Sequence, residues 1–227
     1  MKKHLVVLTG AGVSAESGLQ TFRDSDGLWM GYDVYEVASP AGWEKNPSLV
    51  LDFYNQRRRE VAAALPNEAH QIIASLEENY KVTVVTQNID DLHERSGSKN
   101  VFHLHGEIFK MRSEKDENTF YEIKGDITLG DKAPDGFQWR PHVVWFGERV
   151  SNILKAREIM SMADIFILVG TSLQVYPASG LIDYLPLHAD KYIIDKKPPY
   201  VPEYHNFHVI KESATDGMRA LQKILTS

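Results

Sequence analysis

The stretch that most constrains the fold is LVVLTGAGVSAESG, at residues 5–18. Its four leading apolar residues predict a short buried strand, and Gly10, Gly12 and Ala15 follow in the spacing G-x-G-x-x-G/A. Glycine lets the backbone turn tightly and approach phosphate oxygens. A helix starting there would offer unpaired N–H groups and a partial positive charge to an anion. The pattern therefore predicts a strand–loop–helix unit that binds a dinucleotide.

Further short apolar runs recur along the chain, separated by segments with helical patterns. Strands that are apolar on both faces are typical of a parallel sheet covered by helices on both sides. We therefore expect an α/β fold, a Rossmann-like parallel sheet with helices on both faces plus a small inserted domain. The expected strands are 5–8, 82–86, 165–169, 192–194 and 207–210, and the expected helices are 47–65, 68–79, 89–96, 150–162 and 213–225.

Two segments break this pattern. Residues 19–33 lack the second strand and closing acid of a standard βαβ dinucleotide unit, and they predict a long loop. Long loops in compact domains are usually functional lids or disordered segments. Residues 110–138 are polar, irregular and charged, and they predict a small inserted module. We expect a Rossmann-like dinucleotide-binding domain at 1–33, 80–109 and 141–227, and a small domain made of a helical insertion at 34–79 and a module at 110–140.

Composition limits the class of protein. A net charge of -6 argues against a general nucleic-acid-binding surface. No apolar run approaches the roughly 20 residues that span a bilayer. The absence of cysteine excludes disulfides, thiolate catalysis and cysteine-ligated zinc. We expect a cytoplasmic enzyme that is monomeric, holds no metal, and has no nucleic-acid or membrane partner.

Three polar side chains follow the predicted strand at 82–86, and they are Gln87, Asn88 and Asp90. In an open α/β sheet the carboxyl ends of the strands line the ligand crevice, so these side chains are expected beside it. Asn88 or Asp90 could equally cap a helix. Capping does not explain Gln87, which favours ligand contact.

Two histidines, His103 and His105, follow another short apolar run. At i, i+2 on a strand they would face the same side, which is compatible with a metal pair. No cysteine is available and no third ligand has a recognisable zinc spacing, so a metal is the less favoured interpretation. His105, at a strand end beside the crevice, suits a general base near neutral pH.

Two more segments leave alternatives open. Gly170, Thr171 and Ser172 form a small turn after the predicted strand at 165–169, where hydroxyls could bind phosphate or ribose or simply complete an ordinary turn. Residues 143–148, VVWFGE, are either a core strand or an exposed edge that pairs with an extended peptide.

Together and in this order, these motifs resemble the sirtuins, the NAD-dependent protein lysine deacylases. The resemblance implies a Rossmann-like domain, a small domain, and a cleft between them where the co-substrate NAD meets an acyl-lysine protein or peptide. It covers nearly the whole chain, and the matching segments are GAGVSAESG at 10–18, TFRDSDGLW at 21–29, TQNID at 86–90, HGE at 105–107, VVWFGE at 143–148 and GTSL at 170–173.

The resemblance also implies residue roles. His105 is the general base and Asn88 a second catalytic residue, while Val144, Phe146 and Gly147 pair with the peptide or flank the acyl-lysine. The residues expected to bind NAD are Gly10, Ala11, Gly12, Ala15, Thr21, Phe22, Arg23, Trp29, Gln87, Asn88, Ile89, Asp90, Gly170, Thr171, Ser172, Asp195 and Ala214.

The implied reaction removes the acyl group from lysine and yields nicotinamide and O-acyl-ADP-ribose. ADP-ribosyl transfer or plain NAD hydrolysis would suit the same cleft. A third alternative is an NAD sensor without turnover, which needs a disabled base. The intact His105 and the peptide-pairing motif favour deacylation.

One further match concerns the acyl group. Residues 53–58, FYNQRR, resemble the segment that carries a Tyr-x-x-Arg pair in the desuccinylase/desmalonylase branch. On a helix, Tyr54 and Arg57 lie at i, i+3 on one face, and a phenol with a guanidinium suits a carboxylate. An ordinary amphipathic helix would carry the same pair. The segment PNEAH at 66–70 also resembles the family and fixes the helix register, but it does not distinguish the branch.

Two departures from the family pattern have consequences. Many members bind a structural zinc through four cysteines, whereas Ser113 stands where the first is expected here. Asp195 stands where the family usually has Asn near the adenosine ribose. Its carboxylate can accept hydrogen bonds from ribose hydroxyls but disfavours a 2′-phosphate, so we expect the protein to prefer NAD over NADP. Without zinc, the module is expected to hold together through apolar contacts of Phe120, Tyr121, Ile123, Phe137 and Trp139.

Overall fold

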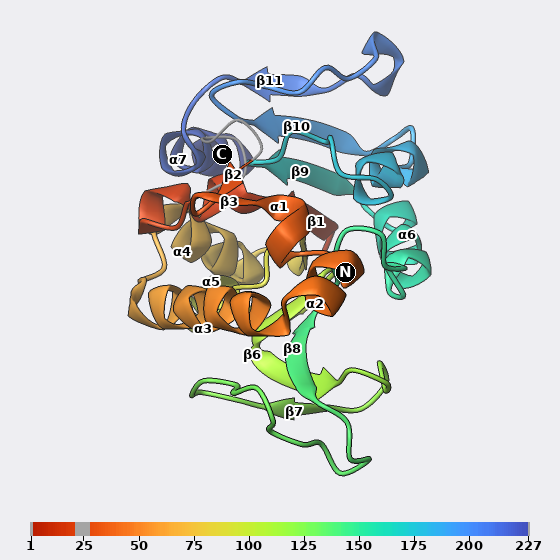
Figure 1. Ribbon diagram of the computed structural model, residues 1–227. Coiled ribbons are helices and arrows are strands. Elements are labelled where there is room, and N and C mark those ends of the chain that lie inside the picture. The colour runs from red at the N-terminus through yellow and green to blue at the C-terminus, as the bar shows by residue number, and fades with distance from the viewer. Residues whose placement is uncertain (1, 21–27, 227) are drawn as a thin grey trace.

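Two sheets organise the chain, a larger parallel one and a smaller antiparallel one (Figure 1). The computed structural model describes residues 2–20 and 28–226. Within these ranges the large sheet has six parallel strands in the order β11-β10-β9-β1-β4-β5. They are β1 His4–Thr9, β4 Lys81–Thr86, β5 Val101–His103, β9 Ile165–Val169, β10 Asp190–Ile194 and β11 His208–Ile210.

The five predicted strands are confirmed, with bounds that differ by at most two residues. All six residues of β1 are buried, because helices cover both faces of the sheet. Leu5 and Val7 join one core layer, while Val6 and Leu8 join the other. Residues that alternate along a strand point to opposite faces, so a continuous apolar run is what a doubly covered strand requires.

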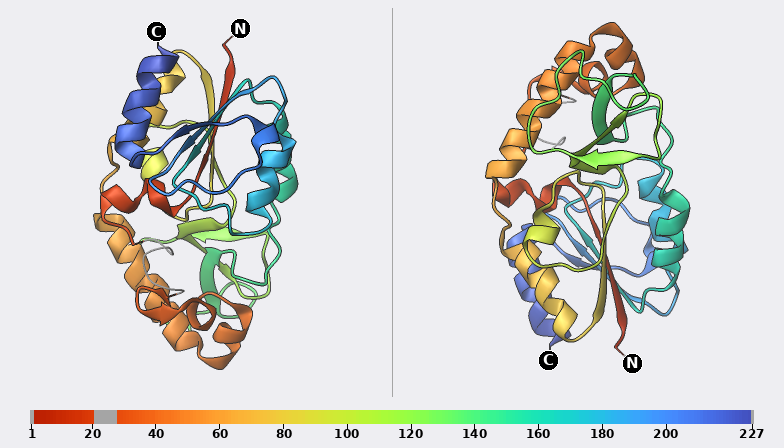
Figure 2. Two further views of the ribbon diagram at one scale, coloured as in Figure 1. Left: turned by 90° about the horizontal axis from the view of Figure 1, so that it is seen from above. Right: turned by 90° about the horizontal axis from the view of Figure 1, so that it is seen from below.

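Four helical segments form the two covering layers (Figure 2). On one face lie α4 Glu68–Ser75 and α7 Ala214–Leu225, and on the other lie α6 Ile153–Ser161 and the 3-10 helix η4 Ala178–Tyr184. The Ser213 hydroxyl accepts a hydrogen bond from Asp216 N and caps α7. A short 3-10 turn, η5 Glu203–His205, precedes β11.

Three predicted helices are four residues shorter in the structure, while those at 47–65 and 213–225 lose only one or two residues, as α3 Pro47–Ala63 and α7. The helix expected at 89–96 is reduced to α5 Leu92–Arg95, that at 150–162 to α6, and that at 68–79 to α4 followed by the 3-10 turn η3 Leu76–Glu78. The prediction of a helix that starts within residues 10–18, called the glycine loop below, is wrong. Two 3-10 turns, η1 Ala11–Val13 and η2 Ala15–Ser17, occupy that position instead.

The small sheet has the strand order β7-β6-β8 and is antiparallel. Its strands are β6 Gly106–Ser113, β7 Phe120–Glu122 and β8 Trp139–Val143, and three helices pack beside it: α1 Val34–Val37, α2 Pro40–Lys45 and α3 Pro47–Ala63. A hairpin of β2 Leu28–Trp29 and β3 Tyr32–Asp33 lies within the segment predicted to be a loop.

The expected helical insertion, 34–79, divides between the two sheets. Helix α3 contributes to the core of the small sheet, whereas Ala69, Ile72 and Ile73 of α4 pack into the core of the large one. We therefore propose that the small domain takes residues up to α3 and leaves α4 to the large domain. No helix in the described ranges has the length and apolar character needed to cross a bilayer.

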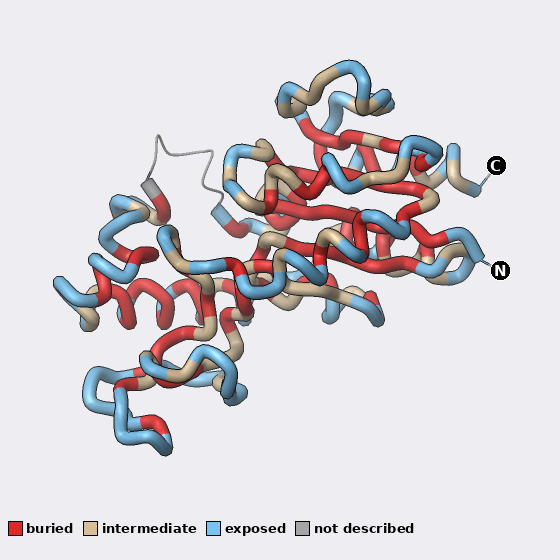
Figure 3. The backbone as a smooth tube through the Cα atoms, turned by 90° about the vertical axis from the view of Figure 1, so that its right-hand side faces the viewer, coloured by how far each residue is buried: buried red, intermediate tan, exposed pale blue. Residues whose placement is uncertain are grey.

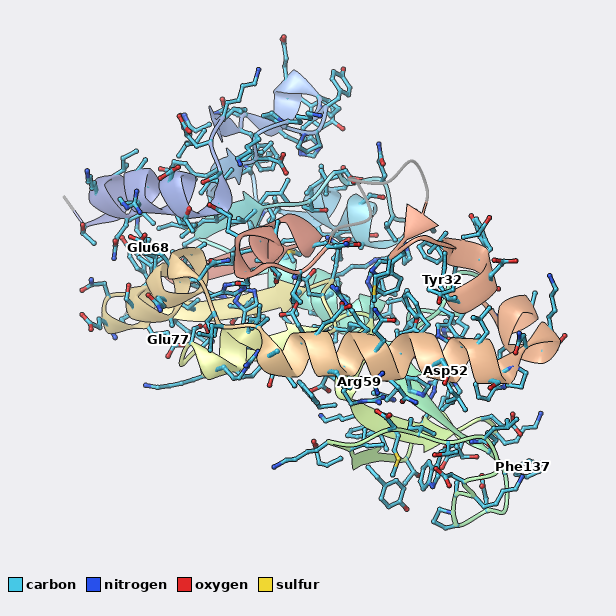
Figure 4. The ribbon with its side chains drawn as sticks, turned by 60° about the vertical axis from the view of Figure 1, so that its left-hand side comes forward. Tyr32, Asp52, Arg59, Glu68, Glu77 and Phe137 are labelled. Atoms are coloured by element: carbon cyan, nitrogen blue, oxygen red, sulfur yellow. The ribbon has the colours of Figure 1, made fainter. Side chains whose placement is uncertain are left out.

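Buried polar side chains of α3, rather than the expected aromatic cluster, anchor the inserted module. Three of the five aromatic or apolar residues expected to hold it are substantially exposed: Phe120 by 47%, Tyr121 by 42% and Phe137 by 44%. Ile123 and Trp139 pack against the small-domain core as expected. Figure 3 shows exposed residues over much of this module, and Figure 4 places Phe137 away from α3.

The anchor is centred on Arg58, which is only 1% exposed. Its Nε donates to the Ile108 carbonyl at 2.9 Å, and its Nη1 donates to the Gly125 carbonyl at 3.1 Å and to Asn55 Oδ1 at 2.8 Å. Asn55 in turn exchanges two hydrogen bonds of 2.9 Å with the backbone of Ile127. Burial lowers the pKa of Arg58 to about 10, so it stays charged at neutral pH.

We expect Arg58→Met to lower the free energy of unfolding by about 3 kcal/mol, because buried carbonyls lose their donors. Urea unfolding measures this value. The neighbouring Arg59→Met is the matched control: Arg59 pairs with Asp126 at the surface, and its loss should cost less than about 1 kcal/mol. Equal costs for the two variants would contradict this account of the anchor.

Candidate active site

A pocket lies where the carboxyl ends of β1, β4 and β9 meet the small domain. It brings together most of the residues predicted from the sequence. These are Gly10, Ala11, Gly12, Trp29, Tyr54, Arg57, Gln87, Asn88, Ile89, Asp90, His105, Val144, Phe146, Gly147, Gly170, Thr171 and Ser172.

Some predicted residues lie elsewhere. Ala15, Asp195 and Ala214 are not among the residues that line this pocket; Ala15 starts η2, Asp195 follows β10, and Ala214 starts α7. Thr21, Phe22 and Arg23 lie outside the described residues. The sequence reasoning missed the lining residues Ser14, Gln20, Ala38, Val143, Trp145, Glu148, Val150, Val175 and Tyr176.

The glycine loop is fastened to the end of β9. Gly10 N donates to the Val169 carbonyl at 3.1 Å, and Gly12 N donates to the Gly170 carbonyl at 2.8 Å. A Cβ on Gly12 would lie 2.7 Å from the Gly170 Cα, and a Cβ on Gly10 would lie 2.7 Å from the Thr171 Cβ. The loop therefore needs glycine for this backbone contact, whatever ligand it faces.

A buried polar chain links the loop to the segment after β4. Asn88 Nδ2 donates to Ser14 Oγ, and Ser14 Oγ donates to Asp90 Oδ2, each at 3.1 Å. Asp90 Oδ1 also accepts a hydrogen bond from Leu92 N at 3.2 Å, but the N-cap residue of α5 is Asp91, so the expected helix cap at Asn88 or Asp90 is wrong. Burial raises the pKa of Asp90, while Leu92 N, Ser14 and Arg57 oppose that rise. These hydrogen bonds hold the Asn88 and Asp90 side chains at the pocket wall.

Gln87 bridges two strand ends. Its Nε2 donates to Thr171 Oγ1 at 3.1 Å and approaches the Thr9 carbonyl at 3.5 Å. The amide thus connects the end of β4 with the turn after β9. This placement agrees with the expectation that capping does not explain Gln87.

His105 lies beside Gln87 in the same pocket. Its Nδ1 is 3.1 Å from the Gln87 carbonyl. Nδ1–H donates to that carbonyl, which assigns the tautomer that leaves Nε2 with a free lone pair. Burial lowers the pKa of His105, partly offset by the Gln87 contact, so the imidazole is mainly neutral at pH 7. A neutral imidazole with an available lone pair can act as a general base.

The other histidine of the motif is engaged elsewhere. His103 Nδ1 is 3.0 Å from the Asn88 carbonyl, and its Nε2 is 2.8 Å from Glu94 Oε1. Burial acts to lower the pKa of His103, but Glu94 outweighs it and the pKa is raised. Across residues 2–20 and 28–226, no group of three His, Cys, Asp or Glu side chains could hold a metal ion.

The segment 143–148 is a strand end followed by a pocket-lining loop. Val143 closes β8, so the core-strand alternative applies only up to that residue. Val144 N then donates to the His105 carbonyl, and Phe146 N donates to the Ala38 carbonyl, each at 2.9 Å. Gly147 has a φ of 91°, which favours glycine at the turn.

The Tyr54 and Arg57 side chains of α3 reach the pocket from the small domain. They are 0% and 6% exposed. Among the described residues, the Tyr54 hydroxyl and Arg57 Nε have no hydrogen-bond partner. Within residues 2–20 and 28–226, the hydrogen bonds of the Arg57 guanidinium are both long, at 3.4 Å to Glu60 Oε2 and to the Gln20 carbonyl. The guanidinium also lies 5.7 Å from the centre of the Trp29 ring. Burial raises the pKa of Tyr54 and lowers that of Arg57.

Comparison with known proteins places this site in a family. A family model described as "Sir2 family" matches residues 10–177. The chain belongs to the Sir2 family. A relative named NAD-dependent protein deacylase, from Helicobacter pylori, is 52% identical over 219 residues, which are 96% of each protein. A Bacteroides thetaiotaomicron protein of the same name is 48% identical over 229 residues, 98% of each.

Solved Sir2 structures share the architecture. A Sir2 homologue in complex with NAD has a TM-score of 0.87 and 37% identity, over 99% of this chain and 90% of that one. A mutant Sir2 homologue in complex with ADP-ribose has a TM-score of 0.88 and 36% identity, over 99% and 94% of the two chains.

In this Sir2 protein, two buried histidines contact each other near the strand ends that carry the pocket. The His70 and His93 rings lie 4.8 Å apart, edge to face. His93 Nε2 is 3.1 Å from Thr9 Oγ1, which donates to Thr86 Oγ1 between β1 and β4. Thr86 Oγ1 also accepts from Asn88 N at 3.0 Å, so the pair supports the strand ends that carry the site.

We expect His70 to make the fold sensitive to acid. Burial, with Arg95 adding and Glu94 opposing, lowers the pKa of His70 from 6.5 to about 4. Below pH 6.5 the unfolded chain binds a proton that folded His70 rejects. The free energy of unfolding should therefore fall by roughly 2–3 kcal/mol from this residue as pH drops from 6.5 to about 4.

Urea unfolding of the wild type and of His70→Gln over this pH range measures the effect. Gln can still accept from Asn67 N, as His70 Nδ1 does, so the cap of α4 is kept. The variant should show a shallower loss of stability toward acid. Identical pH dependence in both proteins would reject a role for His70.

Proposed function

We propose that this chain removes acyl groups from protein lysines with consumption of NAD, and that it accepts acyl groups ending in a carboxylate. The observation that carries the proposal is one pocket that holds an amide and carboxylate cluster, a neutral imidazole and a buried guanidinium. The deacylase name of the relatives, at about half identity over nearly the full length, supports the acyl-removal part.

The pocket residues fit NAD by their chemistry. The Gln87 and Asn88 amides complement a carboxamide, while the Asp90 carboxylate can accept from ribose hydroxyls. The glycine loop adds backbone groups to the same pocket, and these are the expected pyrophosphate contacts. When bound, NAD supplies a ribose carbon whose bond to nicotinamide can be broken by an attacking oxygen.

The protein's own groups have distinct tasks in this reaction. His105 accepts a proton at Nε2, and the Gln87 carbonyl holds its ring in the required orientation. Asn88 and Asp90 orient the co-substrate through their fixed chain with Ser14. The loop at 144–147 forms the wall along which the acyl-lysine enters. Deacylation is favoured over NAD hydrolysis because this wall and a potential base share one pocket.

Tyr54 and Arg57 support the preference for acidic acyl groups. A buried guanidinium whose hydrogen bonds within the described residues are both long is costly unless an anion completes its pairing. A carboxylate at the end of a malonyl or succinyl chain would accept from both side chains. The rival explanation, an ordinary amphipathic helix, does not account for polar atoms buried at the pocket without partners.

We expect Arg57→Met to lower kcat/KM for a succinyl-lysine peptide by roughly a hundredfold, as for loss of a hydrogen-bonded charge partner. The loss for the acetyl-lysine peptide should be much smaller. Nicotinamide release with NAD and each peptide measures both rates, and the exposed Arg59→Met serves as the control. An equal loss of kcat/KM on the two peptides would contradict the proposal that Arg57 binds the acyl carboxylate.

We further propose that the protein prefers NAD over NADP, because the Asp195 carboxylate would repel a 2′-phosphate. Competition binding with NAD and NADP measures the preference. We expect affinity for NADP to be lower by tenfold or more, which corresponds to about 1.4 kcal/mol. Equal affinities would count against Asp195 as a ribose contact.

The small domain is also proposed to fold without zinc. Arg58 and Asn55 supply the cross-links that a metal would otherwise provide. We expect elemental analysis of purified protein to find no stoichiometric zinc, and a chelator to leave its thermal unfolding temperature unchanged. Zinc at one equivalent per chain would refute this proposal.

A further inference from the structure

Among the residues that the structure describes, a third buried donor without a partner belongs to Trp145, a pocket-lining residue whose ring packs near Tyr54. Trp145, in the loop after β8, lines the pocket and is only 2% exposed. Its indole Nε1 has no hydrogen-bond partner among the described residues, as is also true of the Tyr54 hydroxyl and Arg57 Nε. An indole N–H only donates and cannot turn to present an acceptor, so burial without a partner is costly.

The indole N–H and the Tyr54 hydroxyl are close neighbours. Their rings are 6.5 Å apart and inclined by 33°. Burial raises the pKa of Tyr54, while Arg140 and the Trp145 indole N–H act in the opposite direction by stabilising the phenolate. The indole N–H therefore lies close to the Tyr54 oxygen.

The surrounding residues hold the indole in one orientation. Trp145 N donates to Glu148 Oε2 at 2.8 Å, and Glu148 Oε1 accepts from Arg140 Nη1 at 2.7 Å. The Arg140 guanidinium lies 3.2 Å from the centre of the Trp145 ring, and Trp43 packs 5.6 Å away. A donor fixed in this way needs little reorganisation when a ligand arrives.

We propose that Trp145 Nε1 is a third donor to the carboxylate of an acidic acyl-lysine, beside Tyr54 and Arg57. This inference rests on the proposed function and adds a specificity-determining residue to it. A carboxylate has two oxygens with about four lone pairs, enough for a guanidinium, a phenol and an indole. An acetyl group ends in a methyl and leaves the indole N–H unpaired, so Trp145 discriminates by penalising neutral acyl chains.

The test compares Trp145→Phe, which keeps an aromatic ring under Arg140, with Trp139→Phe. Trp139 is the matched control because it packs against Tyr121 in the small sheet and does not line the pocket. We expect Trp145→Phe to lower the succinyl-to-acetyl ratio of kcat/KM by roughly tenfold, mainly through KM for the succinyl peptide. Trp139→Phe should leave this ratio within about twofold. An unchanged ratio in Trp145→Phe overturns the inference.

A second measurement does not depend on turnover. The chain has four tryptophans, so ¹⁵N labelling gives a small set of indole signals, and Trp145→Phe assigns one of them. With ADP-ribose present, a succinyl-lysine peptide should move the Trp145 indole proton downfield more than an acetyl-lysine peptide does. Equal shifts with both peptides overturn the inference.

The outcomes separate the two proposals. If the wild type is inactive on succinyl-lysine and malonyl-lysine peptides, the acidic-acyl function fails and the role of Trp145 fails with it. If the wild type is active and Arg57→Met is selective, but Trp145→Phe keeps the wild-type ratio, only the inference about Trp145 is rejected.

Discussion

The contact between the glycine loop and the end of β9 is the constraint on which the site depends. Two backbone hydrogen bonds hold Gly10 and Gly12 against the end of β9. The approach to Gly170 and Thr171 is possible because glycine has no Cβ atom. Any side chain at these glycines would force the loop away from the sheet. The pocket walls formed by β1, β4 and β9 would then separate, because Gln87 and Ser14 bridge the same elements.

The small domain depends on a different interaction, the burial of charged and amide groups that bind backbone carbonyls. Arg58 and Asn55 tie the inserted module to α3, and Arg140 with Glu148 fixes the loop at 143–148. Arg58 and Arg140 each make three side-chain hydrogen bonds, although Arg58 Nη2 and Arg140 Nε have no partner among the described residues. Several close partners of this kind are the condition under which burying a charge is tolerated. Arg57 lacks such partners, and that difference separates the supporting arginines from the one assigned to ligand binding.

Much of this fold could be predicted from the sequence, because short apolar runs identify strands that are covered on both faces. The chemistry of the site was also predictable, since polar residues such as Gln87 and His105 follow strand ends. The helix after the glycine loop was predicted wrongly: G-x-G-x-x-A describes close backbone packing here, and the chain continues in 3-10 turns. The spacing of glycines in the sequence does not predict which part of the protein a loop will pack against.

The anchoring of the module could not be predicted, because it arises from contacts between residues far apart in sequence. Arg58 meets Ile108 across 50 positions, and nothing local to FYNQRR distinguishes it from the exposed Arg59. Trp145 was missed for a related reason. Its neighbours in VVWFGE were expected to contact substrate, but only the packed structure shows an indole N–H buried without a partner.

The central claim is that NAD is cleaved here only as an acyl group leaves lysine. The most direct measurement is the stoichiometry of nicotinamide release and lysine deacylation, with NAD and an acyl-lysine peptide, compared with NAD alone. The account predicts one nicotinamide for each acyl group removed, and little release without peptide. Release at the same rate without peptide would contradict it and indicate an NAD hydrolase.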